Sequence, residues 1–452
     1  MRAKTTQYLK EVNSMFWPLV ITFSISNILQ VIDTMMLTNY DELAVAGVAS
    51  LSQVMMTIGP VFFAVLSGIG IFASQYYGAK DFKSLKKTFG LSITSGILFG
   101  IIGFLMISLF SESFINFFTK GNADVLNYGL EYAKMYRFVF LLYPVNFAFT
   151  FTYRSIKLTR YPMYITTPMV LINTFLNWVF IFGKFGFEPM GAYGAALATF
   201  IAYLIALITN IIMVMKLDLP FKGTIKEIMD FDFQFVKPII IKTIPIIISE
   251  FLFGTARLLY TKAFATLGTS VFLGERIAEN LTMFVNGFVF ASANTVGAVI
   301  GTALGAMKTE KDKEEVKSKS KFLLICLAVV STSVFVTCWF ILPQVVNFYG
   351  VESQEVYNNA VNLIKLNGLF AGLRTISSSI LFILRAGGDM LYATIVDSGL
   401  AWIIGLPLTY LALWLFDVSA FQLKLVTLIE TVIKVGVALY RYASWKWVKK
   451  VI

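Results

Sequence analysis

Asp33 is a carboxylate inside a long apolar stretch, Pro18 to Thr38, and its type and position suit chemistry with cations. A charged side chain near the middle of a bilayer costs roughly 2.5–3.5 kcal/mol on insertion scales, so such residues usually face a protein interior and mark ion or substrate pathways. The chain contains no histidine, which removes the commonest general base and metal ligand. Proton chemistry would therefore depend on carboxylates, unless Asp33 only reaches the headgroups at the membrane surface.

Amide and hydroxyl side chains that could share a site with Asp33 lie on other apolar segments. Asn173 and Asn177 are four residues apart and fall on one face of a predicted helix. Thr199 follows a run of small residues that would let helices approach closely, and Asn27 precedes Asp33 on its own segment. Their oxygens suit a hard cation such as Na+ at Asp33, Asn173, Asn177 and Thr199, or a buried carboxylate that takes up H+. Alternatively, these amides only join one helix to another.

The second half of the chain carries more charge within apolar segments. Glu250 and Asp397 have no basic residue within a turn of them on their own segments, so we take these two as the ion-coupling groups of this half. Glu279 lies one turn after Glu275, and Arg257 lies seven residues after Glu250. The alternative is a permanent network of ion pairs without a transport role.

Aromatic side chains could hold a cationic substrate, because a cation binds favourably over the face of an aromatic ring. Trp178, next to Asn177, is the candidate we favour, although most of the 43 Phe, 20 Tyr and 7 Trp must face lipid or pack the bundle. Together with the polar residues Asn27 and Glu279 introduced above, Trp178 makes up the predicted set of substrate-binding residues.

Membrane-spanning helices must position these groups. Of the 452 residues, 57% are hydrophobic and 14% are charged, whereas soluble domains have about 25% charged residues. Apolar runs of about 20 residues, each long enough to span a bilayer, occur twelve times. The sequence thus predicts an all-α polytopic membrane protein with two pseudo-symmetric six-helix bundles. The N-lobe covers residues 1–216, a cytoplasmic linker that is either a surface helix or a passive tether covers 217–237, and the C-lobe covers 238–452.

Basic residues lie in short loops between the apolar runs rather than on one face, so the net charge of +11 does not indicate nucleic-acid binding. Loops rich in Lys and Arg stay in the cytoplasm. This places both termini in the cytoplasm. We expect a multi-pass protein of the cytoplasmic membrane, in contact with lipid, and we expect it to act as a monomer.

The two halves resemble each other. A shift of 227 residues places Pro18 on Pro245 and Gly78 on Gly305, and a similar shift places Arg154 on Arg385. Repeats of this kind place substrate and ion sites near the membrane midplane.

Several segments have a distinctive order and spacing: PLVITFSISNILQVIDTMMLTNYDELAVAGVAS, LINTFLNWVFIFGKFGFEPMGAYGAALAT, IPIIISEFLF with LGERIAENLTMF, and RAGGD at 385–389. These segments resemble the multidrug and toxic compound extrusion (MATE) family of bacterial transporters. The resemblance implies a twelve-helix antiporter that exports organic cations in exchange for Na+ or H+. It implies ion coupling at Asp33, with Asn173, Asn177 and Thr199 as partners, and it relates Glu250 to a C-lobe cation site. The sequence has Asn177 where many relatives have a second carboxylate.

The expected activity is therefore drug efflux, with cationic amphiphiles as substrates, Na+ or H+ as the coupling ion and no cofactor. The alternative within transport is a flippase of lipid-linked glycans. A membrane-embedded enzyme is disfavoured because the chain has neither HExxH nor GxSxG, and a channel is disfavoured because no filter-like segment repeats.

Overall fold

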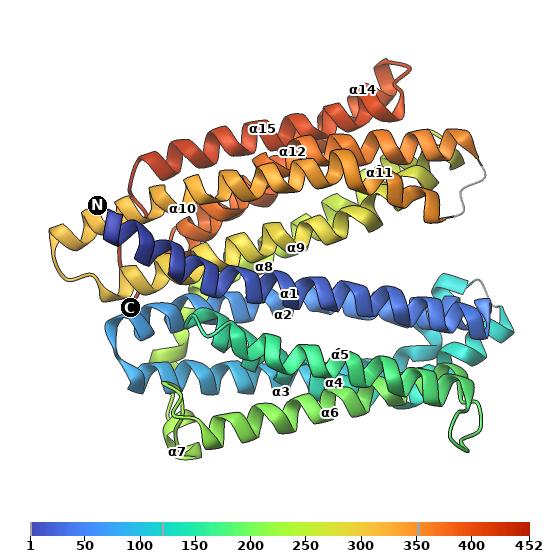
Figure 1. Ribbon diagram of the computed structural model, residues 1–452, viewed down its shortest axis with the longest axis horizontal. Coiled ribbons are helices and arrows are strands. Elements are labelled where there is room, and N and C mark those ends of the chain that lie inside the picture. Colours follow the sequence, from blue (N-terminus) through green and yellow to red (C-terminus); the bar gives the residue numbers. More distant parts are fainter. Residues whose placement is uncertain (1, 120–121, 350–352) are drawn as a thin grey trace. The chain divides into compact units, whose positions relative to one another are not determined.

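The computed structural model describes residues 2–119, 122–349 and 353–452, which fold into helices without any strand (Figure 1). The expected all-α class is therefore confirmed. The helices are α1 (Arg2–Tyr40), α2 (Glu42–Ala79), α3 (Phe82–Thr119), α4 (Ala123–Ser155), α5 (Arg160–Phe182), α6 (Gly191–Lys216), α7 (Ile225–Ile228), α8 (Phe233–Ala265), α9 (Thr269–Ala306), α10 (Glu310–Val336), η1 (Thr337–Ile341), α11 (Leu342–Val345), η2 (Val346–Tyr349), α12 (Gln354–Ala386), α13 (Met390–Thr394), η3 (Ile395–Gly399), η4 (Ala401–Gly405), α14 (Leu406–Leu415) and α15 (Ala420–Ala443).

Ten spans in the described part of the chain are long and apolar enough to cross a membrane. The predicted helices that fall outside this set are α4 and α15, which are long but carry several charged residues. The 24 residues of α15 extend about 36 Å, compared with about 30 Å for the hydrocarbon core. Two of its charges, Lys424 and Lys434, have side chains only 12% exposed. The charges of α15 therefore face the protein interior, which explains why hydropathy alone undervalues this helix.

Helix α10 begins at Glu310, whereas the apolar run expected to form the helix in this part of the sequence begins at Phe322. Thr309 caps it, because its side chain accepts from the N–H of Asp312 while the Asp312 carboxylate accepts from the N–H of Thr309. Such a capping box satisfies two donors that would otherwise be exposed at a helix start. The basic segment Lys308–Lys321, one of those expected to form loops between the apolar runs, is therefore mostly helical.

Met390–Phe416, one of the twelve apolar runs expected to span the membrane, is not one uniform α-helix. Two π-helical segments, η3 and η4, lie between α13 and α14. The N–H of Leu400 bonds the carbonyl of Ile395, and the N–H of Leu406 bonds the carbonyl of Ala401, each five residues back. Since π-helical turns concentrate at functional sites, this span is a natural place to search for one.

The chain forms two compact units, which are described separately below. Unit 1 comprises Met1–Val20, Ser74–Lys80 and Ile240–Ile452, and unit 2 comprises Ile21–Ala73 and Asp81–Ile239. These units group residues that lie close in space, whereas the predicted lobes are continuous stretches of sequence. The predicted lobe boundaries at 216 and 238 therefore remain a proposal. Within the predicted linker, the helical residues are those of α7 and the start of α8.

Each unit has its own apolar core. In unit 1, α9 and α15 pack on α12, around buried side chains that include Val299, Ile383 and Trp447. In unit 2, α4 packs on α3 and α6, around Ile107 and Ile115. These cores fix the helices that present the polar side chains considered next.

A reciprocal close approach in unit 1 relates the two halves of the sequence. A Cβ on Gly78 would collide with the carbonyl of Thr302, and a Cβ on Gly305 would collide with the carbonyl of Gln75. Gln75 and Thr302, like Gly78 and Gly305, are 227 residues apart. This reciprocity is what the sequence repeat leads us to expect.

Candidate ion-coupling site

Four predicted residues of the first half meet in unit 2. The Nδ2 of Asn177 donates to Oδ1 of Asp33 at 2.6 Å and to Oδ1 of Asn173 at 3.2 Å. The Nδ2 of Asn173 donates to Oγ1 of Thr199 at 3.3 Å. Helices α1, α5 and α6 therefore bring one carboxylate, two amides and one hydroxyl into a single hydrogen-bonded group, the Asp33 cluster.

Local sequence explains how α5 and α6 approach each other. A Cβ on Gly194 would lie within 2.9 Å of the backbone of Phe180, so only glycine permits this contact between the two helices. The four-residue spacing of Asn173 and Asn177 places both amides on the same side of α5, where they are 2% and 1% exposed. Buried amides are costly without hydrogen bonds, and the cluster supplies them.

The cluster fits a cation that prefers oxygen ligands. Oδ1 of Asn177 is buried and has no hydrogen-bond partner among the described residues. Turning the Asn173 amide over would place its nitrogen 3.2 Å from Oδ1 of Asp33 and its oxygen within 3.3 Å of two Thr199 donors. The amide groups can thus satisfy the carboxylate by hydrogen bonding, or offer oxygens to a hard ion such as Na+.

The predicted substrate-binding residues of the first half lie less centrally. Asn27 is half-buried on α1. Trp178 is 41% exposed, and its ring centroid lies 5.8 Å from that of Phe185 and 6.2 Å from that of Phe175. Its indole therefore belongs to an exposed aromatic group, and the proposed contact with a cationic substrate remains a prediction.

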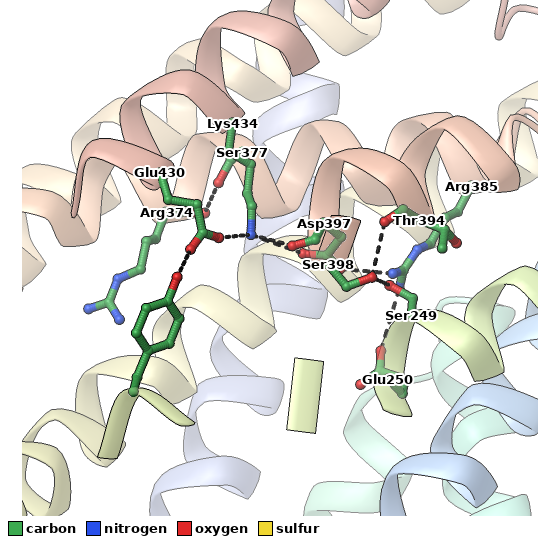
Figure 2. A network of polar contacts seen from close by, with 11 residues as sticks. Ser249, Glu250, Arg374, Ser377, Arg385, Thr394, Asp397, Ser398, Glu430 and Lys434 are labelled. Carbon is green, nitrogen blue, oxygen red and sulfur yellow. Dashed lines mark hydrogen bonds and ion pairs between the residues drawn. The ribbon is translucent and has the colours of Figure 1, made fainter. Parts of the chain in front are cut away.

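Glu250 and Asp397 of unit 1 do have basic neighbours, contrary to our expectation from their own segments. Nη2 of Arg385 lies 2.9 Å from Oδ2 of Asp397, and its Nη1 lies 3.9 Å from Oε1 of Glu250 (Figure 2). Arg385 comes from α12 and its side chain is 3% exposed. Their own segments indeed carry no basic residue within a turn, but the counter-ion is supplied by a different helix, which spacing along one segment does not reveal. Ion coupling at Glu250 and Asp397 remains a prediction.

The network continues through two residues of α15 that the sequence reasoning missed. Nζ of Lys434 lies 3.0 Å from Oε1 of Glu430 and 3.8 Å from Oδ1 of Asp397, and it donates to the main-chain oxygen of Asp397. Oε2 of Glu430 accepts from the hydroxyl of Tyr260 at 2.6 Å. The spacing of Glu430 and Lys434, four residues apart in a membrane-length helix, is the signal that could have found them.

Glu279 lies in a separate ion-pair group of unit 1. Its carboxylate is 3.4 Å from Nη2 of Arg257 and 3.8 Å from Nζ of Lys424. Neighbouring Glu275 is 5% exposed, and its Oε2 has no hydrogen-bond partner among the described residues. The contacts of Glu279 favour a standing ion pair, and its role in substrate binding remains a prediction.

Long apolar helices with carboxylates and amides held in their interior define a multi-pass membrane protein. Comparison with known families gives a match to the MatE model over residues 18–179. The chain is 24% identical to the probable multidrug resistance protein NorM of Thermotoga maritima, over 94% of this chain and 91% of that protein. It is 25% identical to the uncharacterized transporter YisQ of Bacillus subtilis, over 88% of this chain and 86% of that protein.

Solved structures of MATE transporters have the same fold. The Vibrio cholerae MATE transporter VcmN in its bent form matches with a TM-score of 0.84 at 17% identity, over 98% of both chains. An outward-facing multidrug resistance MATE family transporter matches with a TM-score of 0.83 at 16% identity, over 97% of this chain and 96% of that one. These findings confirm the resemblance to bacterial MATE transporters drawn from the motifs, and with it the twelve-helix fold. The matched family consists of transporters and not of enzymes.

Proposed function

We propose that this protein is a secondary antiporter that exports organic cations and drugs in exchange for Na+ or H+. Relatives named as probable multidrug resistance proteins support the efflux activity. The observation that carries the coupling is the carboxylate of Asp33, hydrogen-bonded to Asn177 inside the helices of unit 2. The protein acts in the cytoplasmic membrane as a monomer with both termini in the cytoplasm.

Coupling follows if Asp33 serves either the ion or the drug but not both. A bound Na+ would take oxygens from Asp33, Asn173 and Asn177, and a bound proton would neutralise the carboxylate. Either event removes the negative charge that attracts an organic cation. Alternating access then requires that ion and drug favour opposite states of the same two-state equilibrium.

Asp33 is a better candidate than Glu250 or Asp397 for the exchangeable ion. The described hydrogen-bond partners of Asp33 are neutral amides, whereas Glu250 and Asp397 share the guanidinium of Arg385. A carboxylate that is already paired gains less from a further cation. We therefore assign the main coupling step to Asp33.

Transport of a fluorescent organic cation in proteoliposomes tests this proposal, with a Na+ gradient alone and then a pH gradient alone. Asp33→Asn should abolish gradient-driven export by whichever ion drives the wild type, while leaving the folded protein intact. Asp41→Asn is the matched control. That carboxylate lies directly after α1 and accepts from the N–H of Leu43 at 2.7 Å, a contact that asparagine can keep. Export by Asp33→Asn at the wild-type rate would refute the assignment.

A further inference from the structure

The ammonium group of Lys434 lies between two carboxylates in the interior of unit 1. It contacts Oε1 of Glu430 at 3.0 Å, Oδ1 of Asp397 at 3.8 Å and the main-chain oxygen of Asp397 (Figure 2). All three acceptors are oxygens. Carboxylate and main-chain carbonyl oxygens are also the ligands that hard metal cations take from proteins.

The surroundings hold these oxygens in place. Oε2 of Glu430 accepts from the Tyr260 hydroxyl at 2.6 Å, and Oδ2 of Asp397 accepts from Arg385 at 2.9 Å. Asp397 lies in the π-helical segment η3. Gly405, in η4, has no side chain where a Cβ would collide with the Tyr260 hydroxyl and the Glu430 carboxylate. The space that the ammonium fills is thus surrounded by residues of α8, α12, η3, η4 and α15.

Charge and burial favour a cation at this position. The side chains of Lys434, Glu430 and Asp397 are 12%, 10% and 28% exposed. The described network contains the carboxylates of Glu250, Asp397 and Glu430 with the cations of Arg385 and Lys434. Without Lys434, the guanidinium of Arg385 would be left to neutralise all three carboxylates of this network. Leaving buried carboxylates uncompensated is strongly unfavourable.

We propose that the ammonium group of Lys434 occupies a monovalent-cation site made by Glu430 and Asp397, so that unit 1 holds a tethered cation in place of an exchangeable one. A lysine ammonium is a compact point charge with three donors, which suits oxygens on several sides. The inference rests on the proposed function only in explaining why exchange is confined to Asp33. Removing the ammonium, while leaving the carboxylates, should create a site for Na+.

Equilibrium binding of radioactive Na+ to purified full-length protein in detergent tests the inference. All variants carry Asp33→Asn, so that binding at Asp33 does not contribute. Adding Lys434→Met should produce saturable Na+ binding beyond that of Asp33→Asn alone. Adding Lys434→Arg, which keeps a cation at this position, should produce none.

A second readout serves if Lys434→Met is poorly folded. With Lys434→Ala in the Asp33→Asn background, Na+ or methylammonium should raise the melting temperature. Choline at equal ionic strength should not, because its quaternary nitrogen has no N–H to donate and its methyl groups keep the charge away from the carboxylate oxygens. A ligand that binds the folded state raises stability in this way. The inference is overturned if neither the methionine nor the alanine variant gains Na+ binding or Na+-dependent stability over Asp33→Asn.

This outcome is independent of the proposed function, since it depends on the difference between variants that all lack the Asp33 carboxylate. Export by Asp33→Asn at the wild-type rate would refute the coupling assignment. It would not change what the Lys434 variants show, because their Na+ binding is compared with that of Asp33→Asn alone.

Discussion

Nδ2 of Asn177 lies 2.6 Å from Oδ1 of Asp33, which joins α5 to α1 across 144 residues of chain. Hydrogen bonds to a charged group contribute about 1.5–3 kcal/mol. This contact places an amide, whose buried oxygen has no hydrogen-bond partner in the part of the chain that the structure describes, directly beside the carboxylate. In the proposed antiport, Asn177 is both a partner for the ionised Asp33 and a ligand for the coupling ion.

We expect Asn177→Leu to weaken Na+ binding, because leucine has the same branched arrangement of heavy atoms but neither donor nor acceptor. The loss of one ligand oxygen should raise the half-saturating Na+ concentration about tenfold or more, equivalent to about 1.4 kcal/mol. Na+-dependent transport in proteoliposomes measures this. Asn210→Leu is the control, since it removes another buried amide of unit 2, which bonds Oδ1 of Asn146 at 3.0 Å. Equal Na+ dependence in the two variants would exclude Asn177 as a ligand.

Gly405→Ala should destabilise unit 1 by about 1–3 kcal/mol, because the added methyl group collides with the Tyr260 hydroxyl and the Glu430 carboxylate. Thermal unfolding in detergent measures the change. Combining it with Tyr260→Phe, which removes the hydroxyl, should recover part of the loss. Gly436→Ala in α15 is the control, since a Cβ there meets no atom within 4 Å. If Gly405→Ala leaves the melting temperature unchanged, the polar network is loosely packed around Gly405.

Glu279→Gln should lower the free energy of unfolding by about 3–5 kcal/mol, because it leaves the ammonium of Lys424, only 12% exposed, without its carboxylate partner. Arg257→Gln should lower the free energy of unfolding much less, because Lys424 still neutralises Glu279 and the Arg257 side chain is 59% exposed. Unfolding measurements of both variants check this order. The reverse order would mean that Arg257, rather than Lys424, is the principal counter-ion of Glu279.

The segment between α6 and α8 should loosen in acid. Hydrogen bonding from Lys86, whose Nζ lies 2.9 Å from Oε1 of Glu227, is the main cause that lowers the pKa of Glu227 from 4.5 to about 2. Because the folded-state pKa lies below the ordinary value, this contact stabilises the segment above pH 4.5 and is lost as the pH falls toward 2.

Hydrogen exchange of the α7 amides, corrected for intrinsic rates, measures this local stability. Protection should decline over that acidic range in the wild type. In Glu227→Gln it should be low and independent of pH, while the other helices of unit 2, such as α4 and α6, stay protected in both proteins. Since the Glu227 side chain is 49% exposed, salt should screen the contact and reduce the difference. Unchanged protection of α7 in the variant would contradict this role of Glu227.

The sequence by itself determined the helical class and the composition of the Asp33 cluster. Apolar runs of membrane length leave the backbone no other means of satisfying its hydrogen bonds in lipid than a helix. A helix with 3.6 residues per turn places Asn173 and Asn177 on one side, whatever lies opposite. A lone Asp in an apolar run needs a polar partner, so its association with those amides could be anticipated.

Only the tertiary structure decided which cations balance the carboxylates of unit 1. Arg385 and Lys434 reach Asp397 from α12 and α15, and the pairing depends on how each helix is rotated about its axis. That rotation is decided by packing of whole faces, such as α15 against α12. It also depends on close contacts such as that at Gly405. Spacing along one segment therefore predicted where charges lie, but not that Glu250 and Asp397 would share a guanidinium.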